Sequence, residues 1–167
     1  MEEVIVIVGP TCSGKTKLSI EIAKRIDSEI ISADSRQIYK YLDIGTAKPS
    51  IKDLEKIKHH FINELDPKEY FNVSIFAKKS ESIILEIFHK NKIPIVVGGS
   101  GLYVRALIDG ITESVDTNYE IRSSLLDLRQ KFANDYLYNE LKKVDEVSAT
   151  KMLPQNWKRV IRALEVF

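Results

Sequence analysis

The stretch that decides the fold is GPTCSGKT at residues 9–16, which lies between an apolar run and a helical pattern. Gly9, four intervening residues and then Gly14, Lys15 and Thr16 satisfy every fixed position of the phosphate-binding pattern G-x-x-x-x-G-K-[ST]. Such a loop turns backbone N–H groups toward an anion, and the helix that follows adds its positive end. The sequence therefore predicts a phosphate site, and it names the class of anion but not the reaction.

The residue types in this loop also indicate how the anion is bound. Lys15 brings a mobile positive charge to a terminal phosphate, and the Thr16 hydroxyl is a natural ligand for Mg²⁺, the expected cofactor. Cys12 is the single cysteine and cannot form an internal disulfide, so we expect a loop filler in a reducing compartment. The expected diphosphate- or nucleotide-binding residues are those of the whole loop: Gly9, Pro10, Thr11, Cys12, Ser13, Gly14, Lys15 and Thr16.

Apolar runs alternate with helical periods over the first two thirds of the chain, a pattern typical of an α/β fold with a parallel sheet. Strands are expected at about 4–8, 29–33, 60–63 and 93–97, and helices at about 15–26, 74–90 and 101–108. Beyond Gly110 the pattern is helical only, with helices expected at 118–132, 134–143 and 156–166. We predict a P-loop NTPase-like three-layer core in residues 1–115 and a partial helical attachment in residues 116–167. The last helix is still amphipathic where the chain stops, so we expect the parent sequence to continue.

The composition is that of an ordinary globular protein and narrows the function only slightly. A net charge of +1 provides no global field for a nucleic acid, so any such surface must be local. No apolar stretch reaches membrane-spanning length, and the N-terminal apolar run is too short for a signal peptide. We expect a cytoplasmic protein without a membrane partner.

A second group of polar residues follows the second expected strand. Asp34 falls at the strand's carboxyl end, where ligands collect in open parallel sheets. There its carboxylate can contact Mg²⁺, act as a general base or accept a hydrogen bond from an amine. The alternative is a capping role for the next turn, shared with Ser35. The nearby stretch DIGTAKP at 43–49 forms either part of the site or a solvated loop.

A third group is the glycine-rich turn after the fourth expected strand, Gly98-Gly99-Ser100-Gly101. Glycines between a strand and a helix either admit a ligand close to the backbone or allow tight packing. The turn alone favours packing.

Together, the motifs resemble one family, the tRNA dimethylallyltransferases, also called IPP transferases. GPTCSGKT, DSRQIYKYLDIGTAKP, HHFINELDP, VVGGSGLYVRALIDG and NWKRVIRALEVF stand in that family's order over essentially the whole chain. The resemblance implies transfer of a dimethylallyl group from dimethylallyl diphosphate to N6 of the adenosine 3′-adjacent to the tRNA anticodon, with release of diphosphate. Members are about twice as long, so it also implies a C-terminally shortened chain, whose missing part includes a further active-site arginine.

The same resemblance implies roles for individual residues. Asp34 would accept the proton of the N6 amine, and Thr11 would lie between donor and acceptor, with Lys15 as the third catalytic residue. The implied tRNA contacts are Asp34, Ser35, Arg36, Gln37, Ser100, Arg122, Lys158, Arg159 and Arg162. For the last three, an ordinary solvated basic helix end is the alternative. The resemblance leads us to expect a monomer for the full-length protein, while the oligomeric state of this chain stays open.

Three other functions compete with this interpretation. A shortened remnant would bind diphosphate or RNA without turnover, an adenylate isopentenyltransferase would use free nucleotides, and a P-loop small-molecule kinase would need an arginine-bearing lid. His59 and His60 are expected to be hydrogen-bonded structural residues rather than metal ligands, and Trp157 is expected to pack rather than stack on a base.

Overall fold

The computed structural model describes residues 3–110 and 118–167, and the chain divides into two compact units. We call Met1–Thr112 the core unit and Glu113–Phe167 the helical unit. The boundary expected at 115/116 and most of the polar connector lie outside the described residues. In the described ranges, no helix combines the length and the hydrophobicity that a membrane crossing requires.

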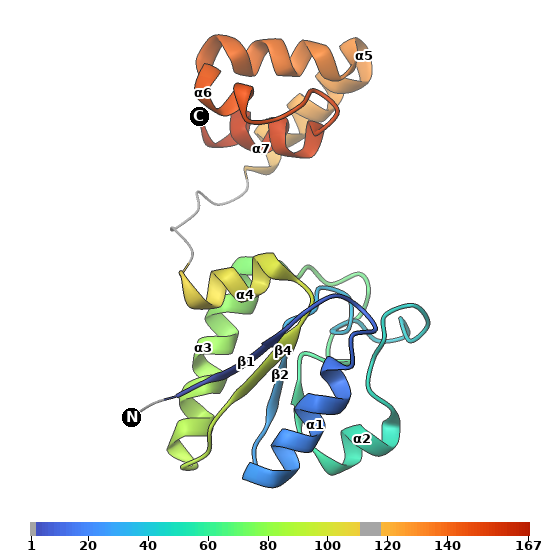
Figure 1. Cartoon of the computed structure of the whole chain (residues 1–167). Helices are drawn as coiled ribbons and strands as arrows, with labels where there is room; N and C mark the ends of the chain where they lie inside the picture. The colour runs from blue at the N-terminus through green and yellow to red at the C-terminus, as the bar shows by residue number, and fades with distance from the viewer. Residues whose placement is uncertain (1–2, 111–117) are drawn as a thin grey trace. The chain divides into compact units, whose positions relative to one another are not determined.

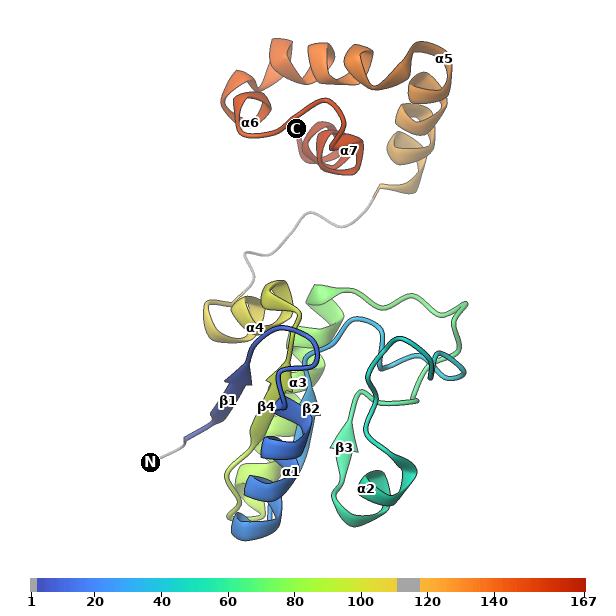
Figure 2. The same ribbon diagram turned by 45° about the vertical axis from the view of Figure 1, so that its right-hand side comes forward.

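The core unit is a parallel sheet covered by helices on both faces (Figures 1 and 2). Its strands are β1 (Ile5–Val8), β2 (Ile30–Ser32), β3 (His59–His60) and β4 (Ile95–Gly98), in the order β1-β4-β2-β3. Its helices are α1 (Lys15–Ile26), α2 (Ile51–Lys56), α3 (Val73–His89) and α4 (Gly101–Ile108). All strand pairs are parallel, which confirms the predicted α/β class.

The two central strands are buried on both faces, and this explains their continuous apolar runs. Ile30 of β2 packs with Ala23 on the side of α1, whereas the next residue, Ile31, packs with Phe76 on the side of α3. Because side chains alternate along a strand, each face needs its own apolar set.

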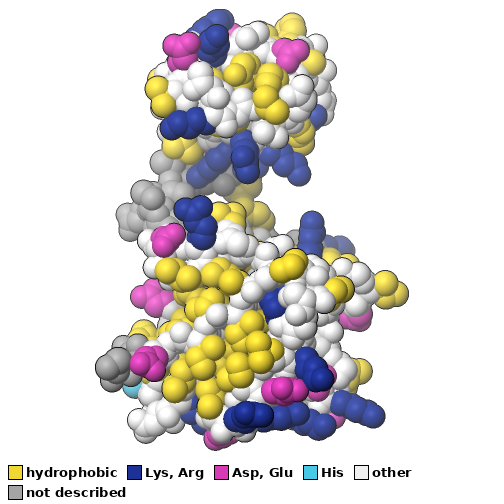
Figure 3. Space-filling view, in the orientation of Figure 1, with side chains coloured by type: hydrophobic (Ala, Val, Ile, Leu, Met, Phe, Trp, Pro, Cys, Tyr) yellow, Lys and Arg dark blue, Asp and Glu magenta, His cyan; other side chains and the backbone are white. Residues whose placement is uncertain are grey.

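The strand β1 lies at the edge of the sheet and pairs only with β4 among the described strands. Val4, Val6 and Val8 along it are 36%, 36% and 60% exposed. Figure 3 shows hydrophobic side chains gathered on the face of the core unit that carries β1. The core unit therefore presents an unpaired edge strand on this side, which is a surface prone to further pairing.

The helical unit consists of α5 (Tyr119–Val144), α6 (Glu146–Thr150) and α7 (Trp157–Val166). A small core of Leu137, Leu141 and Val160 joins α5 to α7. The helix α5 is broken at Ala133, whose φ of 63° and ψ of −174° are not helical. The two helices expected at 118–132 and 134–143 are thus the two halves of α5.

Candidate diphosphate and acceptor site

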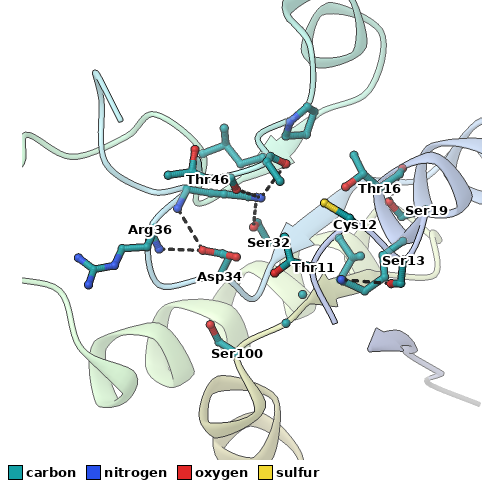
Figure 4. Close-up of a pocket in the computed structure, with 18 of the residues that line it drawn as sticks. Thr11, Cys12, Ser13, Thr16, Ser19, Ser32, Asp34, Arg36, Thr46 and Ser100 are labelled. Carbon is teal, nitrogen blue, oxygen red and sulfur yellow. Dashed lines mark hydrogen bonds between the residues drawn. The ribbon is translucent and has the colours of Figure 1, made fainter. Parts of the chain in front are cut away.

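One pocket opens at the carboxyl ends of β1, β2 and β4 (Figure 4). It is lined by the P-loop, the turn after β2, the loop near residues 45–49 and the glycine turn after β4. The strand order explains this meeting point, because β4 lies between β1 and β2 and the connections diverge at the strand ends. All eight residues predicted for the phosphate site except Gly9 line the pocket.

The P-loop leaves the start of α1 open to an anion. Cys12 and Gly14 have left-handed φ angles of 64° and 87°. Gly14 is the N-cap of α1, and no side chain caps that end of the helix. The first N–H groups of α1 therefore lack a side-chain acceptor and are free to bind a phosphate.

Lys15 and Thr16 supply the side chains of this phosphate site. The Lys15 ammonium donates to the Pro10 carbonyl oxygen at 2.5 Å and lies 3.5 Å from the Ser13 hydroxyl oxygen, so it folds over the loop. The Thr16 hydroxyl lines the pocket and makes no hydrogen bond within the described part of the chain. Mg²⁺ is commonly held by substrate phosphates, waters and few protein oxygens, so this donor set fits the expected ion.

One carboxylate oxygen of Asp34 is held by hydrogen bonds from the backbone, and Asp34 lines the pocket. Its Oδ1 accepts the N–H groups of Arg36, at 2.8 Å, and of Gln37, at 3.3 Å. No hydrogen bond to Oδ2 is formed by the residues that the structure describes. The capping role and the chemical role set out for Asp34 are thus compatible, because the turn fixes the carboxylate that the pocket exposes.

The side chain of Gln37 is used internally, which sequence reasoning did not anticipate. Its Nε2 donates to the carbonyl oxygens of Thr46 and Ala47, at 3.0 and 3.1 Å. Its Oε1 accepts the Ser32 hydroxyl at 2.8 Å. Gln37 therefore fastens the loop near residues 45–49 to the end of β2.

Lys48 fixes the same loop from its other side. Its side chain is 5% exposed, and its ammonium contacts the Tyr39 carbonyl at 2.7 Å, Asp43 Oδ1 at 2.8 Å and Asn63 Oδ1 at 2.6 Å. Three acceptors satisfy all three N–H donors of a lysine. The stretch DIGTAKP is therefore anchored at Lys48 and contributes to the pocket wall, while its residues Asp43 and Ile44 remain exposed. A lysine in a polar stretch carries no signal by which the sequence alone could have revealed this.

The glycine turn after β4 serves close packing, as its sequence favoured. A Cβ at Gly98 would lie 2.0 Å from the carbonyl oxygen of Ala33, so only glycine fits there. This close approach brings Ser100 to the turn after β2, where its hydroxyl oxygen accepts the Ser35 N–H at 3.2 Å.

Comparisons with known proteins identify the family. A family model described as IPP transferase matches residues 37–167, more than half of the chain. This chain belongs to the IPP transferase family. The tRNA dimethylallyltransferase of Acetivibrio thermocellus is 52% identical over all of this chain and 54% of its own length. That of Thermodesulfovibrio yellowstonii is 44% identical over 99% of this chain and 52% of its own length.

Solved structures of tRNA-modifying transferases are also similar to this chain. The tRNA isopentenylpyrophosphate transferase of Bacillus halodurans matches with a TM-score of 0.65 and 39% identity over 99% of this chain and 55% of its own. A eukaryotic dimethylallyltransferase studied while acting on tRNA matches with a TM-score of 0.81 and 37% identity over 99% and 41%. These matches confirm the P-loop NTPase-like fold. The chain spans about half the length of the curated relatives it matches.

The tRNA contacts implied by the family resemblance fall in both units. Ser35, Arg36, Gln37 and Ser100 line the same pocket as Asp34. The other four, Arg122, Lys158, Arg159 and Arg162, lie on α5 and α7 of the helical unit.

Two of these arginines already have an acidic partner inside the helical unit. Arg122 Nη1 lies 3.5 Å from Glu165 Oε2, and Arg162 Nη1 lies 3.2 Å from the same oxygen. The Glu165 side chain is fully buried, with 0% exposed. A buried carboxylate needs such compensation, so both arginines have a structural role that the motif did not indicate.

The two histidines, which form β3, have structural partners. His60 Nε2 lies 2.7 Å from Glu29 Oε2, and Lys90 and Lys58 lie 2.6 and 3.3 Å from the same carboxylate. Burial raises the pKa of Glu29, but these three partners outweigh it and hold that pKa at about 2. His59 Nδ1 lies 2.7 Å from the Ile57 carbonyl oxygen, and burial lowers the pKa of His59. In the described ranges, no group of three metal-binding side chains includes either histidine.

Proposed function

We propose that this chain carries the diphosphate-binding and amine-activating part of a tRNA dimethylallyltransferase. The reaction moves a dimethylallyl group from dimethylallyl diphosphate to N6 of the adenosine 3′-adjacent to the anticodon, in the cytoplasm. The observation that carries this proposal is the shared pocket, in which an uncapped P-loop helix faces an aspartate fixed by the backbone. The names of the relatives, which are tRNA dimethylallyltransferases, support the choice of donor and acceptor.

On the donor side, the residues stabilise a leaving diphosphate. Breaking the allylic C–O bond leaves its electron pair on the diphosphate, whose growing negative charge meets Lys15 and the first N–H groups of α1. Thr16 would hold Mg²⁺, which supplies further positive charge to the leaving group when bound. Thr11 lines the pocket with them, and in this proposal it would lie between the donor and the acceptor.

On the acceptor side, Asp34 prepares the nucleophile. Its free Oδ2 accepts a hydrogen bond from the N6 amine and takes one proton as the new C–N bond forms. Ser35, Arg36 and Ser100 surround this position and would contact the nucleotide, while Lys158 and Arg159 would contact tRNA phosphates.

A second candidate function is the binding of diphosphate and RNA without completion of the transfer. The two functions share the P-loop and differ only in whether Asp34 meets a correctly held amine.

Binding measurements test the assignment of the pocket. Lys15→Ala should weaken binding of Mg²⁺ and dimethylallyl diphosphate by at least about 100-fold, since a charge-assisted contact to the leaving group is lost. Asp34→Asn should leave this affinity unchanged, and Lys24→Ala, in the last turn of α1, is the charge-matched control. Equal affinity in Lys15→Ala and the parent would contradict the P-loop assignment. Phosphoryl transfer from ATP would favour a kinase instead.

A further inference from the structure

Arg129, in the first half of α5, is held differently from the other arginines of the helical unit. Its guanidinium carbon lies 3.9 Å from the ring centroid of Trp157, and its Nε donates to Asn134 Oδ1 at 2.8 Å. The contact with the ring and the hydrogen bond to Asn134 hold the guanidinium at two points. The two terminal amino groups are therefore presented in one orientation.

This arginine has no acidic partner in residues 118–167. Arg122 and Arg162 share the carboxylate of Glu165, whereas no ion pair is formed by Arg129 or Lys158 within the described residues. The Lys158 ammonium lies 5.5 Å from the centroid of the same Trp157 ring. Both cations thus lie near one uncharged ring, whose negative face attracts each of them without neutralising either. An anion bound by both would supply the missing negative charge.

We propose that Arg129 and Lys158 together bind a backbone phosphate of RNA, with Trp157 as the support of the arginine. The inference rests on the proposed function for its RNA partner. A planar guanidinium fork matches a phosphate in a bidentate manner, and a lysine adds a flexible point charge. Because Arg129 covers Trp157, the indole ring orients this arginine and is not a base-stacking platform.

This assignment changes which basic residues carry the RNA contact. Arg129 does not belong to the contacts implied by the family resemblance, whereas Arg122 and Arg162 do. Buried Glu165 offsets one of the two positive charges of Arg122 and Arg162, so their combined attraction to a phosphate is reduced. Arg129 and Lys158 have no carboxylate partner among the described residues.

The test is the affinity of the full chain for unmodified tRNA at several salt concentrations. Arg129→Gln should weaken binding about fivefold at low salt and reduce the slope of log affinity against log salt by roughly 0.7 to 0.9, as expected for one phosphate contact. Lys142→Gln, which removes the same charge from α5 beyond the Ala133 break, should change neither. Trp157 is the single tryptophan, so its emission should change on tRNA binding in the parent and less in Arg129→Gln.

Three outcomes would overturn the inference. Equal weakening by Arg129→Gln and Lys142→Gln would show a diffuse charge effect. Parent-like binding by Arg129→Gln would show that Arg129 only packs. Absence of tRNA binding by the parent, with dimethylallyl diphosphate still bound, would remove this site and leave the proposed donor chemistry standing.

Arg129→Lys provides a second variant if Arg129→Gln does not fold. It keeps the charge but loses the planar fork, so we expect an intermediate affinity with an unchanged salt slope. Parent-like affinity in Arg129→Lys would contradict the bidentate contact.

Discussion

The pocket of the core unit and the helical unit hold their charged side chains in different ways. In the core unit, Lys15 and Asp34 are positioned by nearby backbone groups and face an open pocket. In the helical unit, Arg122 and Arg162 are held by a buried carboxylate on another turn or helix, and Arg129 by an indole ring. A site built by local backbone geometry can therefore be recognised from the spacing of nearby residues in the sequence, whereas a site built by packing between helices cannot.

The largest expected change in the free energy of unfolding concerns the core unit alone. Gly98→Ala would place a methyl group 2.0 Å from the Ala33 carbonyl oxygen, between two strand ends that cannot easily move. We expect a loss of about 3 kcal/mol in the free energy of unfolding of the core unit. In urea, circular dichroism should report this loss, while Trp157 emission, which monitors the helical unit, should not.

Gly101→Ala is the matched control, because a Cβ at that position meets nothing within 4 Å. It should unfold at or above the urea concentration of the parent, since alanine favours the helix that begins there. Similar midpoints for the two alanine variants would contradict the close packing of β4 against the end of β2.

The second effect concerns acid stability of the core unit. The pKa of Glu29 is lowered from its ordinary 4.5 to about 2, so its contribution is fully present above pH 4.5. That contribution is lost as the pH falls from 4.5 toward 2 and amounts to about 3 kcal/mol at most. Glu29→Gln should flatten the dependence of core-unit stability on pH in this window. A variant with the same acid slope as the parent would show that the Glu29 cluster contributes little.

The smallest expected change in stability concerns the helical unit, at the break in α5. Ala133 has backbone angles that glycine adopts far more readily than alanine, so Ala133→Gly should stabilise this unit by about 1 kcal/mol. Ala163→Gly, within the regular helix α7, should instead destabilise it by about 1 kcal/mol. Unfolding followed by Trp157 emission measures both. Destabilisation by both glycines would mean that α5 is continuous at Ala133.

Local patterns predicted much of the core unit. Three apolar runs predicted β1, β2 and β4, and the P-loop spacing predicted the start of α1, because both depend on neighbouring residues in the chain. The strand β3 is His59–His60 and overlaps the run expected at 60–63 only at His60. The short helices α2 and α6 were missed, since six and five residues are too few to show a helical period.

The contacts that complete the site could not be predicted from the sequence. Gln37 was expected to contact tRNA, and the stretch that contains Lys48 was expected to be either part of the site or a solvated loop. Each side chain holds the pocket wall through partners up to 15 positions away. Likewise, Glu165 meets Arg122 across two helices, and no spacing rule connects them. Such pairings depend on tertiary packing, which a single sequence does not display.

The proposed function is tested most directly by measuring the transfer of the dimethylallyl group to tRNA. Labelled dimethylallyl diphosphate, Mg²⁺ and unmodified tRNA would be incubated with the parent chain and with Asp34→Asn, with AMP as the alternative acceptor. We expect label in tRNA with the parent chain, none in AMP, and at least about a 100-fold lower rate with Asp34→Asn. Label in tRNA at the same rate with Asp34→Asn, or no label with the parent despite bound diphosphate, would contradict the proposed function.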